Sequence, residues 1–337
     1  MGGNVMKTRA EIFASASVVG GKESDGPLGK LFDFCDPSDR FGMKTWEKSE
    51  SEMQRMALNI ALANGETNPE DVGALFAGDL LNQCVGSAYG LQGFGIPYIG
   101  LYGACSTCAE SLLLASLMVS YGMCNISAAV TSSHYCSAER QYRTPLEYGA
   151  QRAPTAQWTV TGAGAFLVRG INEKESSGEG KAIVRNCLIG RVQDSGVADA
   201  ANMGAAMAPA ALDTLCRFFK ETQTMPNEYD LIVTGDLGYE GGDILCSLMK
   251  AEGYDIDSVY NDCGRMIYSR EGQDVHGGGS GCGCSAVVLS ADILPKIRRG
   301  ELSRVLFMAT GAMMSPDSLK QGEKILAIAH LLEIEHA

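Results

Sequence analysis

The sequence has no uninterrupted apolar run that reaches the ~18 residues typical of a membrane span. It also lacks an excess of basic residues, because 27 Lys and Arg stand against 40 Asp and Glu, for a net charge of −13. Nucleic acids and anionic lipid surfaces are bound through basic patches, so this charge argues against both as partners. The first residues have neither the charged nor the apolar segment of a secretory signal. We therefore expect no nucleic-acid partner, no direct membrane span and no export.

A disulfide framework is also not expected, although the chain has twelve cysteines. Several of them, such as Cys124 and Cys246, lie in apolar stretches, where a free cysteine acts as a small hydrophobic side chain. Without an export signal, a reducing compartment is the expected environment. Cys105 and Cys108 have the C-x-x-C spacing of redox and zinc sites, but no second C-x-x-C completes a zinc set. We expect no cofactor or metal of the protein's own.

The main feature that is present is a repeated pattern. Residues 102–116 and 278–292 are each a turn of small residues followed at once by an apolar run. A Gly-Asp-Leu triplet precedes each turn, at 78–80 and 235–237, and a strand-like segment follows each apolar run. Three motifs in the same order predict two similar halves. We place these halves at residues 1–170 and 171–337 of one compact unit.

Strand-like and helix-like segments alternate along both halves. Strands are predicted at 74–77, 126–131, 229–234 and 305–309, and helices at 49–63, 109–121 and 200–220. The first of these helices is placed by the capping-box spacing of Ser49 and Glu52. The alternation predicts parallel sheets with helical crossovers, and the duplication predicts two such sheets with a layer of buried helices between them. The polar segment 132–158 is long for a connection, which is typical of a functional loop.

These features resemble the thiolase fold, whose members include thiolases and ketoacyl-acyl-carrier-protein synthases. The resemblance rests on a strand, the segment Gly-Ala-Cys-Ser-Thr at 103–107 and a buried helix, in a chain of two similar halves. It covers most of residues 70–315 and implies an α/β fold of two duplicated halves in five layers, α-β-α-β-α. Within this group the chain is most similar to a family of sporulation proteins. That similarity is carried by segments 25–29, 77–83, 102–107, 131–134, 138–141, 205–210, 261–264, 266–268 and 278–282.

The similarity to the sporulation family implies a binding function. Its members act in the uptake of dipicolinic acid into the developing spore, with calcium as a possible companion of the ligand. They work beside membrane-embedded proteins of the same sporulation operon and are not known as enzymes. The expected location is therefore the cytoplasm or forespore, peripheral to the spore inner membrane. Relatives commonly form two-fold dimers, so we also expect a homodimer.

Cys105 is the sharpest candidate for the site. It comes just before a predicted helix, whose free N–H groups and dipole favour a thiolate. In condensing enzymes the thiolate at this position accepts the acyl chain. The same N–H groups could instead bind a carboxylate ligand. A third interpretation is a small residue needed for packing in a tight turn.

The partners that a condensing enzyme needs are absent from their usual places. Relatives carry His or Asn at the second-half strand end and turn, where this chain has Asp236 and Ser280. The chain has four His in all, and among them His134 and His276 could act from displaced positions. These departures disfavour carbon–carbon bond formation and favour binding. The alternative function is an acyl-transferring or condensing enzyme with Cys105 as nucleophile. A protein that only serves as a scaffold for the membrane partners is the third hypothesis.

Further candidate ligand-binding residues follow the predicted strands. Asp79 and Asp236 occupy equivalent strand ends, where they could contact a calcium ion or cap the following turn. Asn82 could hydrogen-bond a carboxylate or be an ordinary loop residue, and His134 could line the pocket or simply be satisfied in a loop.

Dipicolinate without metal is a dianion and needs cationic donors. Arginine suits a carboxylate best, because its guanidinium binds as a bidentate fork. Arg140, Arg143 and Arg152 all lie in the polar segment, and we expect one of them to reach the ligand. If calcium enters with the ligand the complex is neutral, and Asp or Asn contacts become plausible instead.

Overall fold

The computed structural model of the chain describes residues 4–142, 152–171 and 180–337. The strands of the main sheet order up to residue 170 are β1 (Val5–Gly20), β3 (Ala74–Gly78), β4 (Tyr98–Gly100), β5 (Ile126–Ser133) and β7 (Gly162–Gly170). Those after it are β8 (Ala182–Leu188), β10 (Leu231–Thr234), β11 (Tyr260–Asp262), β13 (Arg304–Met313) and β14 (Leu326–His336). Short strands are β2 (Phe34–Asp36), β6 (Trp158–Thr159), β9 (Gln193–Asp194) and β12 (Gly279–Ser280).

The helices divide in the same way. Up to residue 170 they are α1 (Gly21–Ser24), α2 (Trp46–Asn64), α3 (Val85–Leu91), α4 (Thr107–Ser120) and α5 (Tyr135–Tyr142). Later in the chain come α6 (Met203–Thr222), α7 (Gly238–Ala251), α8 (Cys263–Met266), α9 (Cys282–Val288), α10 (Leu294–Arg298) and α11 (Pro316–Lys320). A π-helical turn, Leu289–Ile293, joins α9 to α10, so these three pieces run on from one another.

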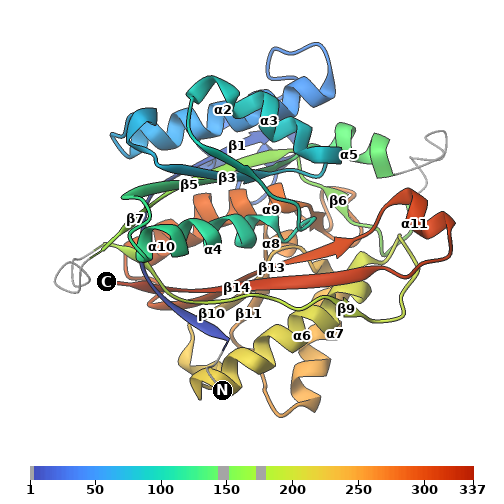
Figure 1. Ribbon diagram of the computed structural model, residues 1–337. Coiled ribbons are helices and arrows are strands. Elements are labelled where there is room, and N and C mark those ends of the chain that lie inside the picture. The colour runs from blue at the N-terminus through green and yellow to red at the C-terminus, as the bar shows by residue number, and fades with distance from the viewer. Residues whose placement is uncertain (1–3, 143–151, 172–179) are drawn as a thin grey trace.

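The elements are stacked in five layers (Figure 1). Helices α2 and α3 cover one layer of strands, and α6 and α7 cover the other. Between the two strand layers lie α4, α9 and α10. The predicted α-β-α-β-α arrangement is confirmed. Among the helices of the described residues, none is long and apolar enough to cross a membrane.

Both strand layers have the same internal order. In chain order the strands of the first layer are β1, β3, β4, β5 and β7, and they lie side by side as β1-β7-β5-β3-β4. The second layer repeats this as β8-β14-β13-β10-β11. The two layers are joined where β1 pairs antiparallel with β8. The predicted division at residues 170 and 171 falls between β7 and β8 and stays a prediction as a domain boundary.

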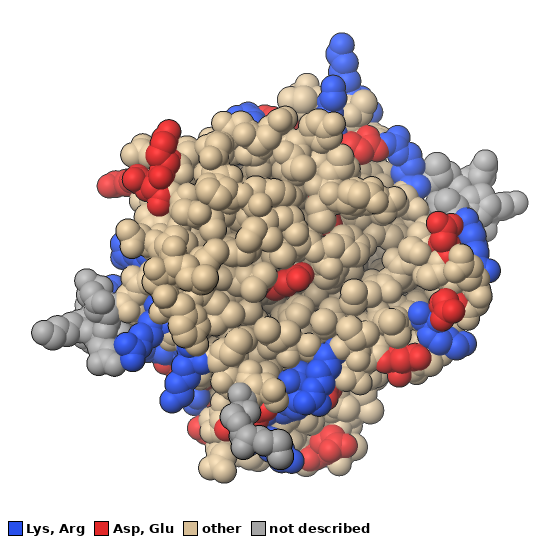
Figure 2. Space-filling model, viewed as in Figure 1, with Lys and Arg blue, Asp and Glu red and all other residues tan. Residues whose placement is uncertain are grey.

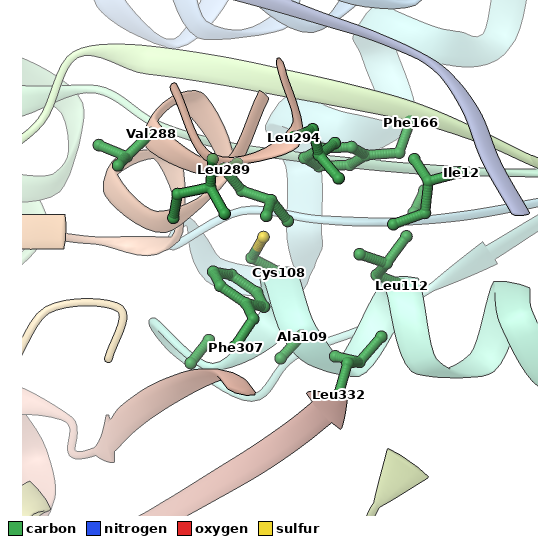
Figure 3. Close-up of a cluster of buried hydrophobic side chains, with 14 of the residues drawn as sticks. Ile12, Cys108, Ala109, Leu112, Phe166, Val288, Leu289, Leu294, Phe307 and Leu332 are labelled. Atoms are coloured by element: carbon green, nitrogen blue, oxygen red, sulfur yellow. The ribbon is translucent and has the colours of Figure 1, made fainter. Parts of the chain in front are cut away.

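The inner helices are apolar on all sides because both of their faces are covered by strands. Helix α4 contacts β1, β3 and β7 on one side and β13 and β14 on the other. Figure 3 shows Cys108, Ala109 and Leu112 of α4 within this core. Ile12 and Phe166 lie on one side of them, and Phe307 and Leu332 on the other. Since water is excluded from both faces, this core explains why the segment lacks a polar stripe.

Element positions differ from the sequence prediction mainly at their ends. Helix α2 begins at Trp46 rather than at residue 49, because the Thr45 side chain caps it by accepting from the Lys48 N–H at 3.4 Å. The Ser49 hydroxyl instead donates to the carbonyls of Arg40 and Thr45. The polar segment 132–158 was not predicted to contain a helix, yet α5 lies within it.

Candidate functional site

The two repeated turns meet between the strand layers. Cys105 lies just before α4, and Ala104 beside it adopts φ +51°, a left-handed conformation that is uncommon for a residue other than glycine. Ser280 lies in β12, just before α9. The Cys105 Sγ is 4.0 Å from the Ser280 Oγ, although 175 residues separate them. The duplication therefore brings the start of one inner helix against the start of the other.

Asp236 connects the elements behind this meeting point. Its carboxylate accepts from the Ser280 hydroxyl at 3.2 Å and from the Gly281 N–H at 2.9 Å. The Thr310 hydroxyl of β13 donates to its other oxygen at 2.9 Å. These contacts hold the end of β10, the start of α9 and β13 together, and they leave Asp236 only 1% exposed.

The electrostatics disfavour a nucleophilic thiolate. Burial raises the pKa of the Cys105 thiol well above its usual range, and the charge of Asp236 raises it further. Burial also raises the pKa of the Asp236 carboxyl. A reactive cysteine needs a neighbouring cation or base that lowers its pKa. Here the neighbour is a carboxylate, which raises the pKa of the thiol instead of lowering it.

A cavity of about 400 Å³ opens in front of Cys105. Its wall is largely apolar and consists mostly of small side chains: Leu80, Ala104, Ala138, Ala153, Ala156, Ala200, Ala201, Met203, Ala312 and Met314. The polar residues that line it are Tyr102, Cys105, Glu139, Tyr142, Gln157, Thr159 and Ser280. Glu139 is the one charged residue among the described residues of the wall.

Two tyrosines form part of the wall. The Tyr142 hydroxyl donates its one proton to the Leu80 carbonyl at 2.8 Å. In the 2.6 Å contact between the two tyrosine hydroxyls, Tyr102 is therefore the donor and Tyr142 the acceptor. Tyr142 also packs against Leu80 and Cys105. The cavity thus has aromatic rings beside the thiol and a short chain of hydrogen bonds that holds them in place.

The predicted site residues lie in different places relative to the cavity. Cys105 and Ser280 line the cavity, and Asp236 supports them from behind. Asp79 and His134 are fully buried away from its lining. Asp79 accepts from the N–H groups of Leu81 and Ser87, which is the capping role considered from the sequence.

His134 is held by backbone groups. One of its ring nitrogens lies 2.8 Å from the Asp39 carbonyl and the other accepts from the Cys136 N–H. Burial lowers the pKa of this imidazole. His276 contacts one backbone group and one side chain, with Nδ1 2.9 Å from the Ala153 carbonyl and Nε2 2.9 Å from the Asp274 carboxylate.

The arginines considered for the ligand are engaged elsewhere. Arg140 forms an ion pair with Glu47 and, with Asn82, lines a second hollow of about 360 Å³. Arg152 pairs with Asp274 at 2.9 Å and is not part of the described cavity wall. Arg143 lies outside the described residues.

Sequence reasoning missed most of the cavity's polar lining. Glu139 and Tyr142 belong to α5, and the length of the polar segment that contains them was the available signal. Gln157 carried no sequence signal, yet its amide donates to the carbonyls of Asp236 and Gly279 at 2.6 and 2.9 Å. Among the described residues, no group of three or more His, Cys, Asp or Glu side chains is arranged to hold a metal ion.

Comparison with known proteins extends these observations. The family described as "Stage V sporulation protein AD" matches residues 3–335. Stage V sporulation protein AD of Bacillus subtilis is 41% identical over 324 residues, which are 96% of this chain and 94% of that protein.

Solved structures with the same fold are more distant in sequence. A variant of OleA from Xanthomonas campestris has a TM-score of 0.62 at 14% identity, over 99% of both chains. The 3-oxoacyl-[acyl-carrier-protein] synthase III of Aquifex aeolicus has a TM-score of 0.59 at 12% identity, over 97% of this chain and 100% of that one. These similarities show a thiolase-like fold.

Proposed function

This chain belongs to the stage V sporulation protein AD family, and we propose that it binds dipicolinic acid, as the calcium chelate, in the cavity beside Cys105. It does so without catalysing a reaction. Binding serves uptake of the ligand into the developing spore. The membrane-embedded proteins of the stage V A operon are its partners, and the protein lies peripheral to the spore inner membrane.

The cavity carries this proposal. Its volume of about 400 Å³ lies within the ~300–1,000 Å³ range of small-molecule pockets. A mostly apolar wall with a few polar groups suits a flat aromatic ring that carries polar substituents. Tyr102 and Tyr142 offer aromatic surfaces for such a ring.

The chemistry around Cys105 supports binding over catalysis. A condensing enzyme needs a thiolate and a group that polarises a thioester carbonyl. Asp236 and Ser280 occupy the places at the second-half strand end and turn, and a buried carboxylate opposes both requirements.

Calorimetric titration of the purified protein with dipicolinate, with and without calcium, tests the proposal. We expect saturable binding that is weakened by Cys105→Ala and abolished by Ala156→Trp, which fills the cavity. Ala63→Trp is the matched control, because Ala63 is exposed on α2. Absence of binding under both conditions, or equal loss in the two Trp variants, would contradict the proposal.

Acyl transfer remains the second candidate, because Cys105 opens into the cavity at the start of α4. An enzyme would become acylated at Cys105 when incubated with an acyl thioester, and intact-mass spectrometry would detect the adduct. We expect no adduct. A protein that only holds its membrane partners together would bind neither dipicolinate nor the acyl group.

A further inference from the structure

Two cations lie together at Trp158 of β6, outside the cavity. Gln157 and Thr159, on either side of Trp158 in the chain, both line the cavity, whereas Trp158 is not part of its described wall. Because side chains alternate along a strand, the Trp158 ring lies on the face of β6 away from the cavity. The Lys22 ammonium is 3.9 Å from the centroid of this ring, and the Arg152 guanidinium is 4.8 Å from it. The fold thus places two positive groups at one indole.

These two cations have few negative partners. The Arg152 Nη2 lies 2.9 Å from the Asp274 carboxylate and donates to the Asp274 carbonyl at 2.7 Å. The same carboxylate lies 2.9 Å from the His276 Nε2, so one acid serves two partners. Among the described residues, none forms a hydrogen bond or an ion pair with the Lys22 ammonium.

The charge of Arg152 acts on Lys22. Burial, and after it the charge of Arg152, lower the pKa of Lys22, and the carboxylates of Asp274 and Glu23 only partly offset this. Like charges repel more strongly near a protein surface than in bulk water. The arrangement is therefore unfavourable unless a further negative charge is added.

Arg152 also has an unused donor. Its side chain is 5% exposed, and its Nη1 is buried without a hydrogen-bond acceptor. Buried polar groups in proteins are rarely left unpaired, because an unmade hydrogen bond costs free energy. A guanidinium binds most strongly to carboxylate and phosphate oxygens. The free Nη1 therefore favours an anionic acceptor that the described residues do not supply.

We propose that Lys22 and Arg152 form a binding site for one oxyanion group, a carboxylate or a phosphate, beside the Trp158 ring. The anion accepts from the Lys22 ammonium and the Arg152 Nη1, and its charge offsets the repulsion between them. The ring is held in place by Tyr135, which stacks on it with centroids 3.9 Å apart. Lys22 is partly exposed and can rotate to admit the anion. This site is separate from the cavity and does not depend on the ligand bound there.

The fluorescence of Trp158 tests the site. The chain has two tryptophans, so Trp46→Phe leaves Trp158 as the single indole. In this background, sodium phosphate and sodium acetate are titrated separately, with sodium chloride at equal ionic strength as the reference. We expect a saturable change with at least one oxyanion, because the bound anion moves the Lys22 ammonium relative to the ring.

A substitution at Lys22 and a matched control identify the binding residues. Lys22→Gln should weaken the binding at least about tenfold, which corresponds to about 1.4 kcal/mol. Lys250→Gln, at an exposed residue of α7, should keep the affinity of the parent protein. A measurement that does not use the indole is the melting temperature, which a ligand of the folded state raises by mass action. The bound oxyanion should raise it more in Lys250→Gln than in Lys22→Gln.

The two sources of the oxyanion give different results. Saturation with phosphate alone would assign the site to a phosphate-bearing ligand, saturation with acetate alone to a carboxylate, and saturation with both to either group. A change that chloride reproduces, or one that Lys22→Gln retains in full, would refute the site. Neither result bears on the binding of dipicolinate in the cavity.

Discussion

At the scale of single residues, the main feature of the site is that Cys105 lies beside the buried acid Asp236. The turn and helix start that would activate a cysteine are present, but the adjacent group is a buried acid. Cys105 is therefore part of the cavity wall, and both burial and Asp236 raise the pKa of its thiol.

Removing the acid should expose the latent reactivity of the thiol. In Asp236→Asn the negative charge that raises the pKa of Cys105 is gone, so more thiolate forms at a given pH. A fall of one pKa unit gives about tenfold faster alkylation. Iodoacetamide labelling at pH 8, followed by peptide mass spectrometry, measures the rate at Cys105. Equal rates in the two proteins, both shown to be folded by circular dichroism, would contradict the assigned influence of Asp236.

Two buried acids, Glu50 and Asp79, interact with each other away from the cavity lining. Glu50 accepts from the hydroxyls of Ser132 and Ser137 at 3.0 and 2.6 Å, and Asp79 accepts from the Ser87 hydroxyl at 2.6 Å. Burial, together with the charge of Asp79, raises the pKa of Glu50 to about 8. Burial also raises the pKa of Asp79.

This pair should make stability depend on pH. A pKa that is raised on folding stabilises the protein fully below the unfolded value, which for Glu50 is about 4.5. That contribution is lost as pH rises through about 8. The slope is at most about 1.4 kcal/mol per pH unit for each proton released. We expect the melting temperature of Glu50→Gln to fall less than that of wild type between pH 6 and pH 9.

Thermal unfolding across this range measures the effect. Glu70→Gln, on the surface, should follow the wild-type curve. Parallel curves for Glu50→Gln and wild type would show that Glu50 does not release a proton in this range.

At the scale of elements, the inner helices depend on glycines that allow close approach. Gly281 at the start of α9 has φ +102°, and a Cβ there would lie 2.5 Å from the Ser133 Oγ. A Cβ on Gly283 would lie 2.4 Å from the Gly162 carbonyl oxygen. This packing sets α9 against β5 and β7 and so fixes the place of Ser280.

Gly283→Ala should therefore destabilise the protein. The clash is with backbone, which cannot move without separating α9 from β7, so we expect a loss of about 1–3 kcal/mol of unfolding free energy. Gly93→Ala is the matched control, since its Cβ would meet no atom within 4 Å. Urea denaturation of both variants measures the difference. If the two variants had similar urea midpoints, the space between α9 and β7 would be large enough for a methyl group, contrary to the structure.

At the scale of the whole molecule, β4 lies at an edge of the sheet, and no other strand of the described residues pairs with its outer side. Strand β4 ends the strand order, and Tyr98 and Ile99 in it are 39% and 45% exposed. Tyr89 of α3 and Tyr102 are 69% and 40% exposed. Figure 2 shows that the middle of the face seen in Figure 1 is mostly uncharged. An unpaired strand edge with apolar side chains is suited to pairing with another strand.

We propose that two copies of the chain pair through β4. Light scattering coupled to gel filtration should then give twice the chain mass of 35.7 kDa. Ile99→Lys should shift the protein to the mass of one chain, because two lysines would meet at the interface. Met225→Lys, at a residue that is 48% exposed elsewhere, should leave the dimer intact. A wild-type protein with the mass of a single chain would refute the pairing.

The amino-acid sequence by itself determined the fold and the family. The repeated small-residue turns and the apolar segments around them specify buried helices between two strand layers, because only burial on both faces permits such runs. Distinctive segments such as 77–83 and 205–210 specified the sporulation family. Both conclusions depend on local sequence patterns, which can be recognised without knowing the tertiary contacts.

Only the tertiary structure decided which polar residues line the cavity. Asp79 and Asp236 follow equivalent strands, yet Asp79 caps α3 beneath Leu80 while Asp236 lies against Ser280. The sequence did not predict that Arg140 pairs with Glu47 and Arg152 with Asp274, and ligand contact by either arginine stays a prediction. Each of these outcomes depends on partners far away in the chain, so the composition of the cavity wall follows from how the two halves pack and not from the order of residues along either one.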